Sequence, residues 1–474
     1  MILKRFYDEK LAQASWLVGC SGHALVVDPA RDVEPYLRAA EEEKVRITHV
    51  TETHIHADFV SGARELAERT GAQLLLSGEG GAEWSYGYDA TLLHDGDRFQ
   101  IGNVRVQVMH TPGHTPEHLS FVVTDNGADA PMGVFTGDFV FVGDVGRPDL
   151  LERAANIAGT MEAGARTLFR SLRRFVAEVP DFVQLWPGHG AGSACGKALS
   201  AIPTSTLGYE KRFNWALRHA DEDAFAAEVL AGQPEPPMYF AQMKRINRDG
   251  PPLLGEWHRP PRLSAGKVHE LLAEGATLVD TRPAAEWARR HIPGTLSVPM
   301  GKSFATWAGS VLPYDQPFFL IVDESVADEA VRALAAIGLD APGGYATPDV
   351  VDAWTEEHRA AGVLPRIAPD DADERRVKGL VEVVDVRNGS EWAAGHIPGS
   401  RNVPLGRLSE RLTELPRDRP LVVHCQSGAR AGVAISLLRA RGFTDVQHLE
   451  GDWAEWSRSG RPSELGAGET QPAG

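Results

Sequence analysis

Histidine and aspartate residues recur in four short segments of the N-terminal half. The segments are ETHIHADFVSG (52–62), TPGHTPEH (111–118), TGDF (136–139) and PGHG (187–190). The candidate ligands within them are His54, His56, Asp58, His114, Asp138 and His189. Imidazole and carboxylate groups are common metal ligands. Any one histidine is as well explained as a surface or hydrogen-bonded loop residue, but four segments in this order favour a metal centre.

The elements around these segments must place them at one edge of the fold. Short apolar runs precede most of the segments, as in ITHVTETH (47–54) and VRVQVMHTPGH (104–114), and helical patterns such as SGARELAERTG lie between them. A longer helical pattern, EAGARTLFRSLRRFVAEV, precedes a strand, FVQLW. Strands that end in loops bearing His or Asp predict a layered α/β domain with its site at the strand ends.

The order of these segments resembles the metallo-β-lactamase superfamily, over roughly residues 1–245. The resemblance implies an αββα sandwich with metal held between two sheets. Binuclear hydrolases of this superfamily, such as glyoxalase II, have the pattern H-x-H-x-D-H, whereas here Phe59 takes the place of the last His. A phenyl ring has no electron pair for a metal, so the second site lacks a nitrogen ligand.

A one-metal centre resembles the persulfide dioxygenases of the superfamily. Their pattern implies one mononuclear Fe(2+) per chain, held by His54, His114 and Asp138, and two histidines with one carboxylate are typical of non-haem iron oxygen chemistry. The segments FVGDVGRPDL (141–150) and STLGYEKRFNWAL (205–217) resemble the same branch. The remaining candidates are expected to orient the ligands or line the pocket. They are His56, Asp58, His189, Arg147, Asp149 and Phe59, with an ordinary surface turn as the alternative for the Arg147–Asp149 pair.

An internal repeat fills the C-terminal half. Residues 278–300 (LVDTRPAAEWARRHIPGTLSVPM) and 383–405 (VVDVRNGSEWAAGHIPGSRNVPL) match at 12 of 23 positions with an offset of 105 residues. That offset suits a small domain. The Pro- and Gly-rich segment 247–262 and the segment 366–376 are expected to be linkers. The predicted domains are 1–246, 263–365 and 376–462, followed by a disordered tail over 463–474.

The second copy carries a candidate nucleophile in LVVHCQSGARAGVAISLLRARGF (421–443). A strand runs into the loop Cys425–Arg430, which opens a helix. Inward-pointing backbone N–H groups, the helix N-terminus and Arg430 would all favour the thiolate of Cys425, the nucleophilic form. A buried structural cysteine is the alternative. The loop, with DVR…EW…GHIPG before it and HLEGDWAEW after it, resembles the rhodanese family, since a dual-specificity phosphatase loop has more residues between Cys and Arg.

The other cysteines and the first copy carry less chemistry. In the first copy Asp323 stands near the place of Cys425, and no cysteine occurs from 196 to 424. We expect a catalytically dead pseudo-rhodanese that positions its neighbours or forms an oligomer interface. Cys195, close in sequence to His189, is either an auxiliary thiol facing the metal pocket or a small buried residue. Cys20 is expected to pack in a strand.

The composition restricts the remaining function classes. The 474 residues carry a net charge of −17, which disfavours nucleic acid and anionic membrane surfaces. The sequence shows neither a signal peptide nor an apolar span long enough for a membrane, and three scattered cysteines predict a reducing, cytoplasmic location.

The whole chain resembles a fusion of a persulfide dioxygenase, a pseudo-rhodanese and a rhodanese, as in bacterial sulfide detoxification. The fusion implies a small-molecule thiol persulfide, such as that of coenzyme A or glutathione, and O2 as substrates. It also implies sulfite at the iron, thiosulfate from sulfur transfer at Cys425, and a homo-oligomer. Two alternatives stay open: a binuclear zinc thioester hydrolase of the glyoxalase II type with rhodaneses attached, and a non-catalytic sulfur carrier or sensor.

Overall fold

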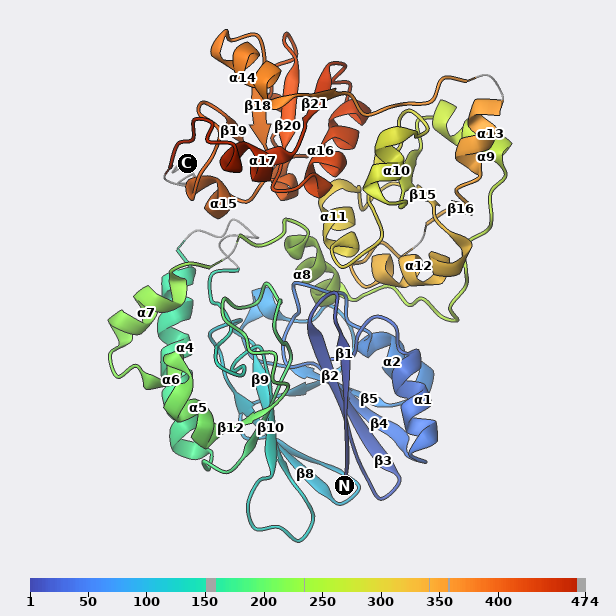
Figure 1. Ribbon diagram of the computed structural model, residues 1–474. Coiled ribbons are helices and arrows are strands. Elements are labelled where there is room, and N and C mark those ends of the chain that lie inside the picture. The colour runs from blue at the N-terminus through green and yellow to red at the C-terminus, as the bar shows by residue number, and fades with distance from the viewer. Residues whose placement is uncertain (151–158, 234, 341, 357–358, 467–474) are drawn as a thin grey trace. The chain divides into compact units, whose positions relative to one another are not determined.

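The computed structural model describes residues 1–474 except 151–158, 234, 341, 357–358 and 467–474. The chain divides into two compact units (Figure 1). Unit 1 comprises Met1–Trp257 together with Ala335–Gly338, and unit 2 comprises His258–Leu334 and Leu339–Gly474.

Unit 1 contains two six-stranded sheets. The first has the order β1-β2-β3-β4-β5-β6 and the second the order β12-β11-β10-β9-β8-β7. The strands are β1 (Ile2–Asp8), β2 (Gln13–Cys20), β3 (His23–Val27), β4 (Arg46–Thr51), β5 (Gln73–Ser77), β6 (Thr91–Leu93), β7 (Arg98–Ile101), β8 (Val104–His110), β9 (Leu119–Thr124), β10 (Gly133–Gly137), β11 (Gln184–Pro187) and β12 (Ser205–Thr206). Strands such as β2, β3, β9 and β10 are short and have mostly buried residues, whereas the outer strands β1 and β12 are only partly buried.

Helices cover the outer face of each sheet (Figure 1). Apolar side chains of both sheets meet between the sheets. The helices of unit 1 are α1 (Glu34–Glu42), α2 (Ala63–Thr70), α4 (Met161–Glu178), α5 (Leu207–Phe213), α6 (Trp215–Arg218), α7 (Glu222–Leu230) and α8 (Phe240–Asp249). Trp16, Phe121, Phe135 and Trp186 fill the space between the sheets. The predicted αββα sandwich is confirmed.

Unit 2 contains two smaller, parallel sheets, one for each copy of the repeat. Their strand orders are β14-β13-β15-β16 and β17-β21-β20-β18-β19. The first copy consists of α9 (Ala265–Ala273), β13 (Thr277–Asp280), α10 (Ala284–Arg289), β14 (Leu296–Ser297), α11 (Phe304–Val311), β15 (Phe318–Ile321), α12 (Ala327–Ala335), β16 (Tyr345–Ala346) and α13 (Val350–Glu356). The second consists of β17 (Arg366–Ile367), α14 (Pro369–Val377), β18 (Glu382–Asp385), α15 (Gly389–Ala393), β19 (Arg401–Asn402), β20 (Leu421–His424), α16 (Ala429–Ala440), β21 (Val446–Leu449) and α17 (Asp452–Arg458). The predicted pair of α/β modules is confirmed.

The segments expected to be linkers and tail are more ordered than their composition suggested. Helix α8 continues to Asp249, so the first three residues of the segment 247–262 are helical. Residues 366–376 form β17 and most of α14. Helix α14 begins at a proline. Within a sequence a proline suggests a break in helical structure, but it is well suited to the first turn of a helix. Of the predicted tail, 467–474 lie outside the described residues, while Glu464 exchanges two backbone hydrogen bonds with His396.

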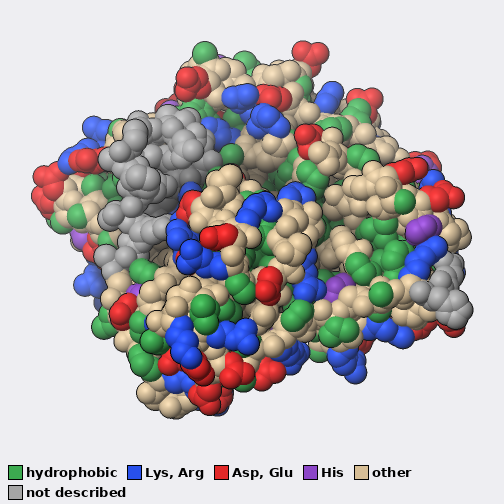
Figure 2. Space-filling model, turned by 90° about the horizontal axis from the view of Figure 1, so that it is seen from above, with side chains coloured by type: hydrophobic (Ala, Val, Ile, Leu, Met, Phe, Trp, Pro, Cys, Tyr) green, Lys and Arg blue, Asp and Glu red, His purple; other side chains and the backbone are tan. Residues whose placement is uncertain are grey.

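The distribution of surface charge and the length of the helices relate to the predictions about nucleic acid and membrane partners. Figure 2 shows Lys and Arg interspersed with Asp and Glu on the face in view. Among the helices of the described residues, none is both long and apolar enough to cross a membrane.

Candidate functional site

The loops after β4, β8 and β10 bring His54, His114 and Asp138 together. The Nε2 atoms of His54 and His114 lie 3.8 and 3.6 Å from Asp138 Oδ2. All three side chains are buried, and within the described part of the chain Oδ2 has no hydrogen-bond partner. A buried carboxylate oxygen without a partner is costly. Two ring nitrogens directed at it make a donor set that a metal ion fits.

The protonation of these groups also suits a metal. Burial lowers the pKa of His54 well below its ordinary value, the nearby His56 lowers it further, and burial likewise lowers the pKa of His114. Burial alone would raise the pKa of Asp138, but the charge and hydrogen bond of His189, together with His54 and His114, outweigh it and hold that pKa well below its usual value. Neutral imidazoles and an ionised carboxylate are the forms that bind metal.

Hydrogen bonds fix the orientation of both imidazoles. His54 Nδ1 donates to Thr53 Oγ1 (3.0 Å), which itself donates to Asp28 Oδ2 (2.9 Å). Gly137 packs so closely there that a Cβ on it would come within 2.3 Å of Thr53 Oγ1. His114 Nδ1 donates to the carbonyl of Arg147 (2.9 Å). Each Nε2 is therefore left free to bind a metal.

His189 links Asp138 to Asp58. Its Nδ1 lies 2.6 Å from Asp138 Oδ1 and its Nε2 lies 2.7 Å from Asp58 Oδ2. Burial by itself would lower the pKa of His189, but the two carboxylates outweigh burial and raise the pKa to about 10. Cys195 completes a second group, since its Sγ and one atom each of Asp58 and His189 lie within 4.8 Å of one another. The buried Cys195 thus lies beside Asp58 and His189, and burial, Asp58 and Asp138 raise its pKa well above the ordinary thiol value.

His56 is directed away from this donor set, although it is two residues from His54. Its Nε2 lies 2.9 Å from Glu52 Oε2 and 3.2 Å from Asp28 Oδ1. Burial lowers its pKa, but these two carboxylates raise it well above the ordinary value. The buried ring of Phe59 packs against the His56 ring at a centroid distance of 4.4 Å.

Arg147 and Asp149 form a fully buried ion pair, so the surface-turn alternative is wrong. The guanidinium donates to both carboxylate oxygens at 2.7 Å. Arg147 also donates from its side chain to the carbonyl of Ala194 (3.1 Å) and from its backbone to that of Cys195 (3.2 Å). The pair therefore holds the backbone carbonyl that orients His114 and ties that loop to the Cys195 segment.

Two residues that the sequence did not single out support the metal site. His118 Nε2 accepts the N–H of Asp138 (3.2 Å), and its ring stacks on His54. Asn247 donates to the carbonyls of His56 (2.8 Å) and Phe59 (2.7 Å) and accepts the N–H of Ser61 (2.9 Å). His118 lies within the segment TPGHTPEH and was visible there. Asn247 was not visible, because it stands far along the chain in a segment that looked like a linker.

The second copy of the repeat presents Cys425 at the end of β20. The buried thiol accepts the N–H of Gly428 (3.1 Å), and Gly428 has a positive φ of 98°. The loop N–H groups and Arg430 lower the pKa of Cys425, as the prediction requires, but two other influences oppose them. Burial raises the pKa of Cys425 and Asp452 raises it further, which outweighs the N–H groups of the loop and Arg430.

The charge of Arg430 is largely taken up by a neighbour. Its guanidinium binds both carboxylate oxygens of Glu391, at 2.6 and 2.8 Å. A bidentate pair of this kind leaves less positive charge for the sulfur than the loop pattern alone suggested. The sequence did not predict that Glu391 binds Arg430. Both copies of the repeat have a glutamate at this position, so the residue pointed to shared packing and not to the cysteine loop.

The first copy has no cysteine at the corresponding place. Sheet register pairs Asp280 with Ile321 and Asp385 with His424, so Val322 is the counterpart of Cys425. Asp323, which was expected near that place, stands one residue later and caps a short 3-10 turn. A valine side chain cannot carry sulfur, which supports the interpretation of a dead module.

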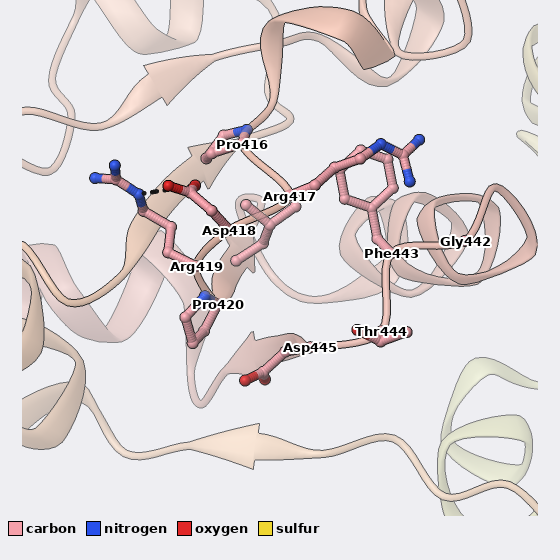
Figure 3. Close-up of a pocket in the computed structure, with 10 residues that line it drawn as sticks. Pro416, Arg417, Asp418, Arg419, Pro420, Gly442, Phe443, Thr444 and Asp445 are labelled. Carbon is pink, nitrogen blue, oxygen red and sulfur yellow. Dashed lines mark hydrogen bonds and ion pairs between the residues drawn. The ribbon is translucent and has the colours of Figure 1, made fainter.

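A surface pocket in the second copy lies away from Cys425. Figure 3 shows it between the turn Pro416–Pro420 and residues 442–445. Arg417 lies over the ring of Phe443, 4.1 Å from its centroid. The pocket is at the N-terminal end of β20, whereas Cys425 follows its C-terminal end. It takes no part in the site described above.

Comparison with known proteins places both halves of the chain. The family model described as the metallo-beta-lactamase superfamily matches residues 9–189, and the rhodanese-like domain model matches residues 264–350 and 368–459. The crystal structure of a metallo-beta-lactamase from Staphylococcus aureus subsp. aureus COL is 42% identical, with a TM-score of 0.65. The similarity covers 73% of this chain and 99% of that one.

Two curated relatives match the N-terminal part. A hydroxyacylglutathione hydrolase of Rhodospirillum rubrum is 32% identical over 176 residues, which cover 37% of this chain and 60% of that protein. The mitochondrial persulfide dioxygenase ETHE1 of Bos taurus is 25% identical over 193 residues, which cover 40% of this chain and 68% of that protein. The chain belongs to the metallo-beta-lactamase superfamily and joins that domain to two rhodanese-like domains.

Proposed function

We propose that the chain is a non-haem Fe(II) persulfide dioxygenase coupled to a rhodanese sulfurtransferase. The first reaction is R-SSH + O2 + H2O → R-SH + SO3²⁻ + 2 H⁺, with a low-molecular-weight thiol persulfide as substrate. The observation that carries the proposal is the buried set of His54, His114 and Asp138, whose ring nitrogens lie 3.8 and 3.6 Å from Asp138 Oδ2. His56 is turned away from this set towards Glu52. Two histidines and one carboxylate are the donors of oxygen-activating ferrous sites. Catalytic zinc uses the same donors, so metal content decides between the two ions.

The residues of this site would perform three tasks. His54, His114 and Asp138 would hold the ferrous ion, which supplies redox chemistry towards O2 when bound. The pair of Asp58 and His189 would keep the second carboxylate oxygen of Asp138 occupied and its charge compensated. The buried walls, including Phe59, would exclude bulk water from the reacting sulfur.

The rhodanese step uses Cys425 as the nucleophile. Its sulfur attacks the outer sulfur of R-S-SH, the S–S bond breaks, and the thiolate R-S⁻ leaves and takes up a proton. Sulfite then attacks the outer sulfur of Cys425-S-SH, so that thiosulfate forms and the Cys425 thiolate leaves. The N–H of Gly428, 3.1 Å from Sγ, supports the leaving thiolate.

The first copy would serve as a scaffold for the second. The N–H of Ser297 on β14 donates to Ser436 Oγ on α16 (2.9 Å), and both residues are buried. Helix α16 begins directly after the cysteine loop, so this contact braces the element that shapes the loop. The domains we propose are 1–246, 263–365 and, beginning with β17, 366–462. Coenzyme A or glutathione persulfide as the substrate and a homo-oligomeric state belong to the same proposal.

A binuclear zinc thioester hydrolase is the second candidate. The group of Asp58, His189 and Cys195 favours it, because a thiolate sulfur could replace the nitrogen ligand that Phe59 withholds. The hydroxyacylglutathione hydrolase relative points the same way. Against it, both nitrogens of His189 are already engaged by carboxylates.

Metal content and oxygen uptake distinguish the two candidates. The purified chain should hold one iron and consume O2 with glutathione or coenzyme A persulfide, giving sulfite. Asp138→Ala should lose both iron and O2 uptake. Two zinc ions per chain, hydrolysis of S-lactoylglutathione and no O2 uptake would overturn the proposal.

The role of Phe59 has its own test. Phe59→His restores the nitrogen ligand, so we expect a second metal equivalent and lower O2 uptake. Phe59→Leu, which keeps an apolar wall, is the matched control and should bind one metal. Unchanged metal content in Phe59→His would count against this role.

A further inference from the structure

Asp452 has an unusual backbone conformation beside the rhodanese cysteine. It follows Gly451 at the start of α17 with φ of 54°, in the left-handed region that residues with a side chain rarely adopt. Its carboxylate is buried. A glycine would adopt this conformation without strain, so the reason for an aspartate at this position lies in the contacts of its carboxylate.

Both carboxylate oxygens of Asp452 are used at the site. Oδ1 accepts the backbone N–H of Cys425 (2.8 Å), and Oδ2 lies 3.0 Å from Nε2 of His448. The next residue, Trp453, donates its N–H to the carbonyl of Cys425 (3.0 Å). The start of α17 therefore holds the first residue of the cysteine loop from two sides.

His448 lies against the same loop. A Cβ built on Gly428 would lie 3.2 Å from Asp452 Oδ2 and 3.4 Å from His448 Cε1. Gly428 in turn donates to the Cys425 sulfur. In the described part of the chain, Nδ1 of His448 is buried without a hydrogen-bond partner. The Asp452–His448 pair is thus next to the reacting sulfur, and it is held by one strand and one helix.

Most other charges around Cys425 are paired with each other. The charged and titratable side chains that face it are Asp385, Arg387, Glu391, His424, Arg430, His448 and Asp452. Arg430 is bound by Glu391. Arg387 is bound by Asp385, which also lies 3.7 Å from His424 Nε2. Asp452 is the carboxylate bound to the Cys425 backbone, and its own partner is the His448 imidazole.

We infer that Asp452 and His448 are positioning residues that restrain the ionisation of Cys425 and so set the reactivity of the resting thiol. Asp452 fixes the loop through the Cys425 N–H, and its negative charge disfavours a thiolate beside it. His448 holds the other carboxylate oxygen, Oδ2, at 3.0 Å and so keeps the Asp452 carboxylate in place. The inference rests on the proposed role of Cys425 in sulfur transfer, but its test does not require turnover.

The test is the pH profile of Cys425 alkylation by iodoacetamide in the full-length chain, measured on the Cys425 peptide by mass spectrometry. Asp452→Asn keeps an oxygen acceptor for the Cys425 N–H and removes the charge. We expect the midpoint of its profile to fall by about one pH unit and the rate at pH 7 to rise by up to about tenfold. His448→Gln should have no further effect in the Asp452→Asn background, since it acts through the Asp452 carboxylate.

Matched controls keep the result interpretable. Asp349, four residues after Tyr345 in the first copy, corresponds to Asp452 by register, and Asp349→Asn should leave the Cys425 profile unchanged. Asp452→Gly, which relieves the backbone, serves if Asp452→Asn does not fold. An unchanged or raised midpoint in the folded variant overturns the inference. A lowered midpoint in a chain that forms no thiosulfate from persulfide and sulfite would instead refute the proposed function alone.

Discussion

The two copies of the repeat in unit 2 share their packing and differ in their loops. Each has a tryptophan stacked on a histidine four residues later. The ring centroids are 3.9 Å apart for Trp287 and His291 and 3.6 Å apart for Trp392 and His396. In each, the histidine Nδ1 donates to the tryptophan carbonyl. The D-x-R pair is also repeated, as Asp280 with Arg282 and Asp385 with Arg387.

The difference that bears on the chemistry lies in the loop after the central strand. Where the second copy has Cys425, Gly428 and Arg430, the same register in the first copy gives Val322, Ser325 and Ala327.

The first copy fills that space with its own charges. Tyr345 donates to Glu324 at 2.9 Å, and Arg259 binds both Glu324 and Asp328. The repeated motif therefore encodes packing, and the loop alone carries chemistry.

The largest expected effect is that of Cys425→Ser on sulfur transfer. Serine is close in size, so the buried loop should keep its shape, but its hydroxyl is a far poorer nucleophile than a thiolate. Thiosulfate formation from persulfide and sulfite should fall by about a thousandfold or more. O2 uptake with persulfide should be unchanged. Substantial thiosulfate formation in this variant would show that the two copies do not differ in the way described.

A cysteine placed in the first copy tests whether the thiol alone makes the difference. In a Cys425→Ser background, Val322→Cys should restore less than about 1% of the wild-type rate, because a nucleophile without its supporting groups recovers little activity. In the first copy the acidic Glu324 lies in this loop, and Ala327 stands where the second copy has Arg430, so the introduced thiol lacks a positive neighbour. Adding Ala327→Arg should improve the rate only modestly. Recovery to near the wild-type rate would mean that the loop environment matters little.

The shared stacking pairs should contribute similarly to stability. His291→Ala and His396→Ala each remove a buried ring stack and one hydrogen bond, with an expected cost of about 2 kcal/mol in each copy. Hydrogen exchange of the strands β13 and β18, followed by mass spectrometry, measures the two copies separately. A large cost in one copy and none in the other would contradict a common packing role.

The smallest effect is that of the ion pair found in the second copy. Burial raises the pKa of Glu391, but Arg430 lowers it by more, so the folded pKa lies below the unfolded one. Its contribution is therefore present above the unfolded pKa and is lost as the pH falls through the folded pKa. Glu391→Gln should cost about 0.5 kcal/mol at pH 7, because the pair is partly exposed to solvent, and the cost should vanish in acid.

The first copy offers the control for this variant. Glu286 is the repeat counterpart of Glu391 and lies exposed in α10. Glu286→Gln should change neither the stability nor its pH dependence. A cost that persists unchanged to pH 3 would show that Glu391 stabilises through packing and not through its charge.

Much of the architecture could be predicted from the sequence, because the helices and strands follow from local patterns of apolar and polar residues. Apolar runs and helical periodicity predicted the layers, and the repeat predicted two modules. Segments of polar composition were misjudged where a distant partner orders them. Asn247 is helical and buried because it binds the 52–62 loop, which lies far away in the sequence.

The sequence by itself determined which residues were available for chemistry: the spaced His and Asp segments, the loss of a ligand at Phe59 and one cysteine in a rhodanese-like loop. Only the tertiary structure decided the protonation and the orientation of those side chains. His56 is turned towards Asp28 and Glu52, and the negative charge of Asp452 disfavours ionisation of the Cys425 thiol. Burial strengthens each such interaction, and the partners come from elements far apart in the chain, so spacing along the sequence cannot reveal them.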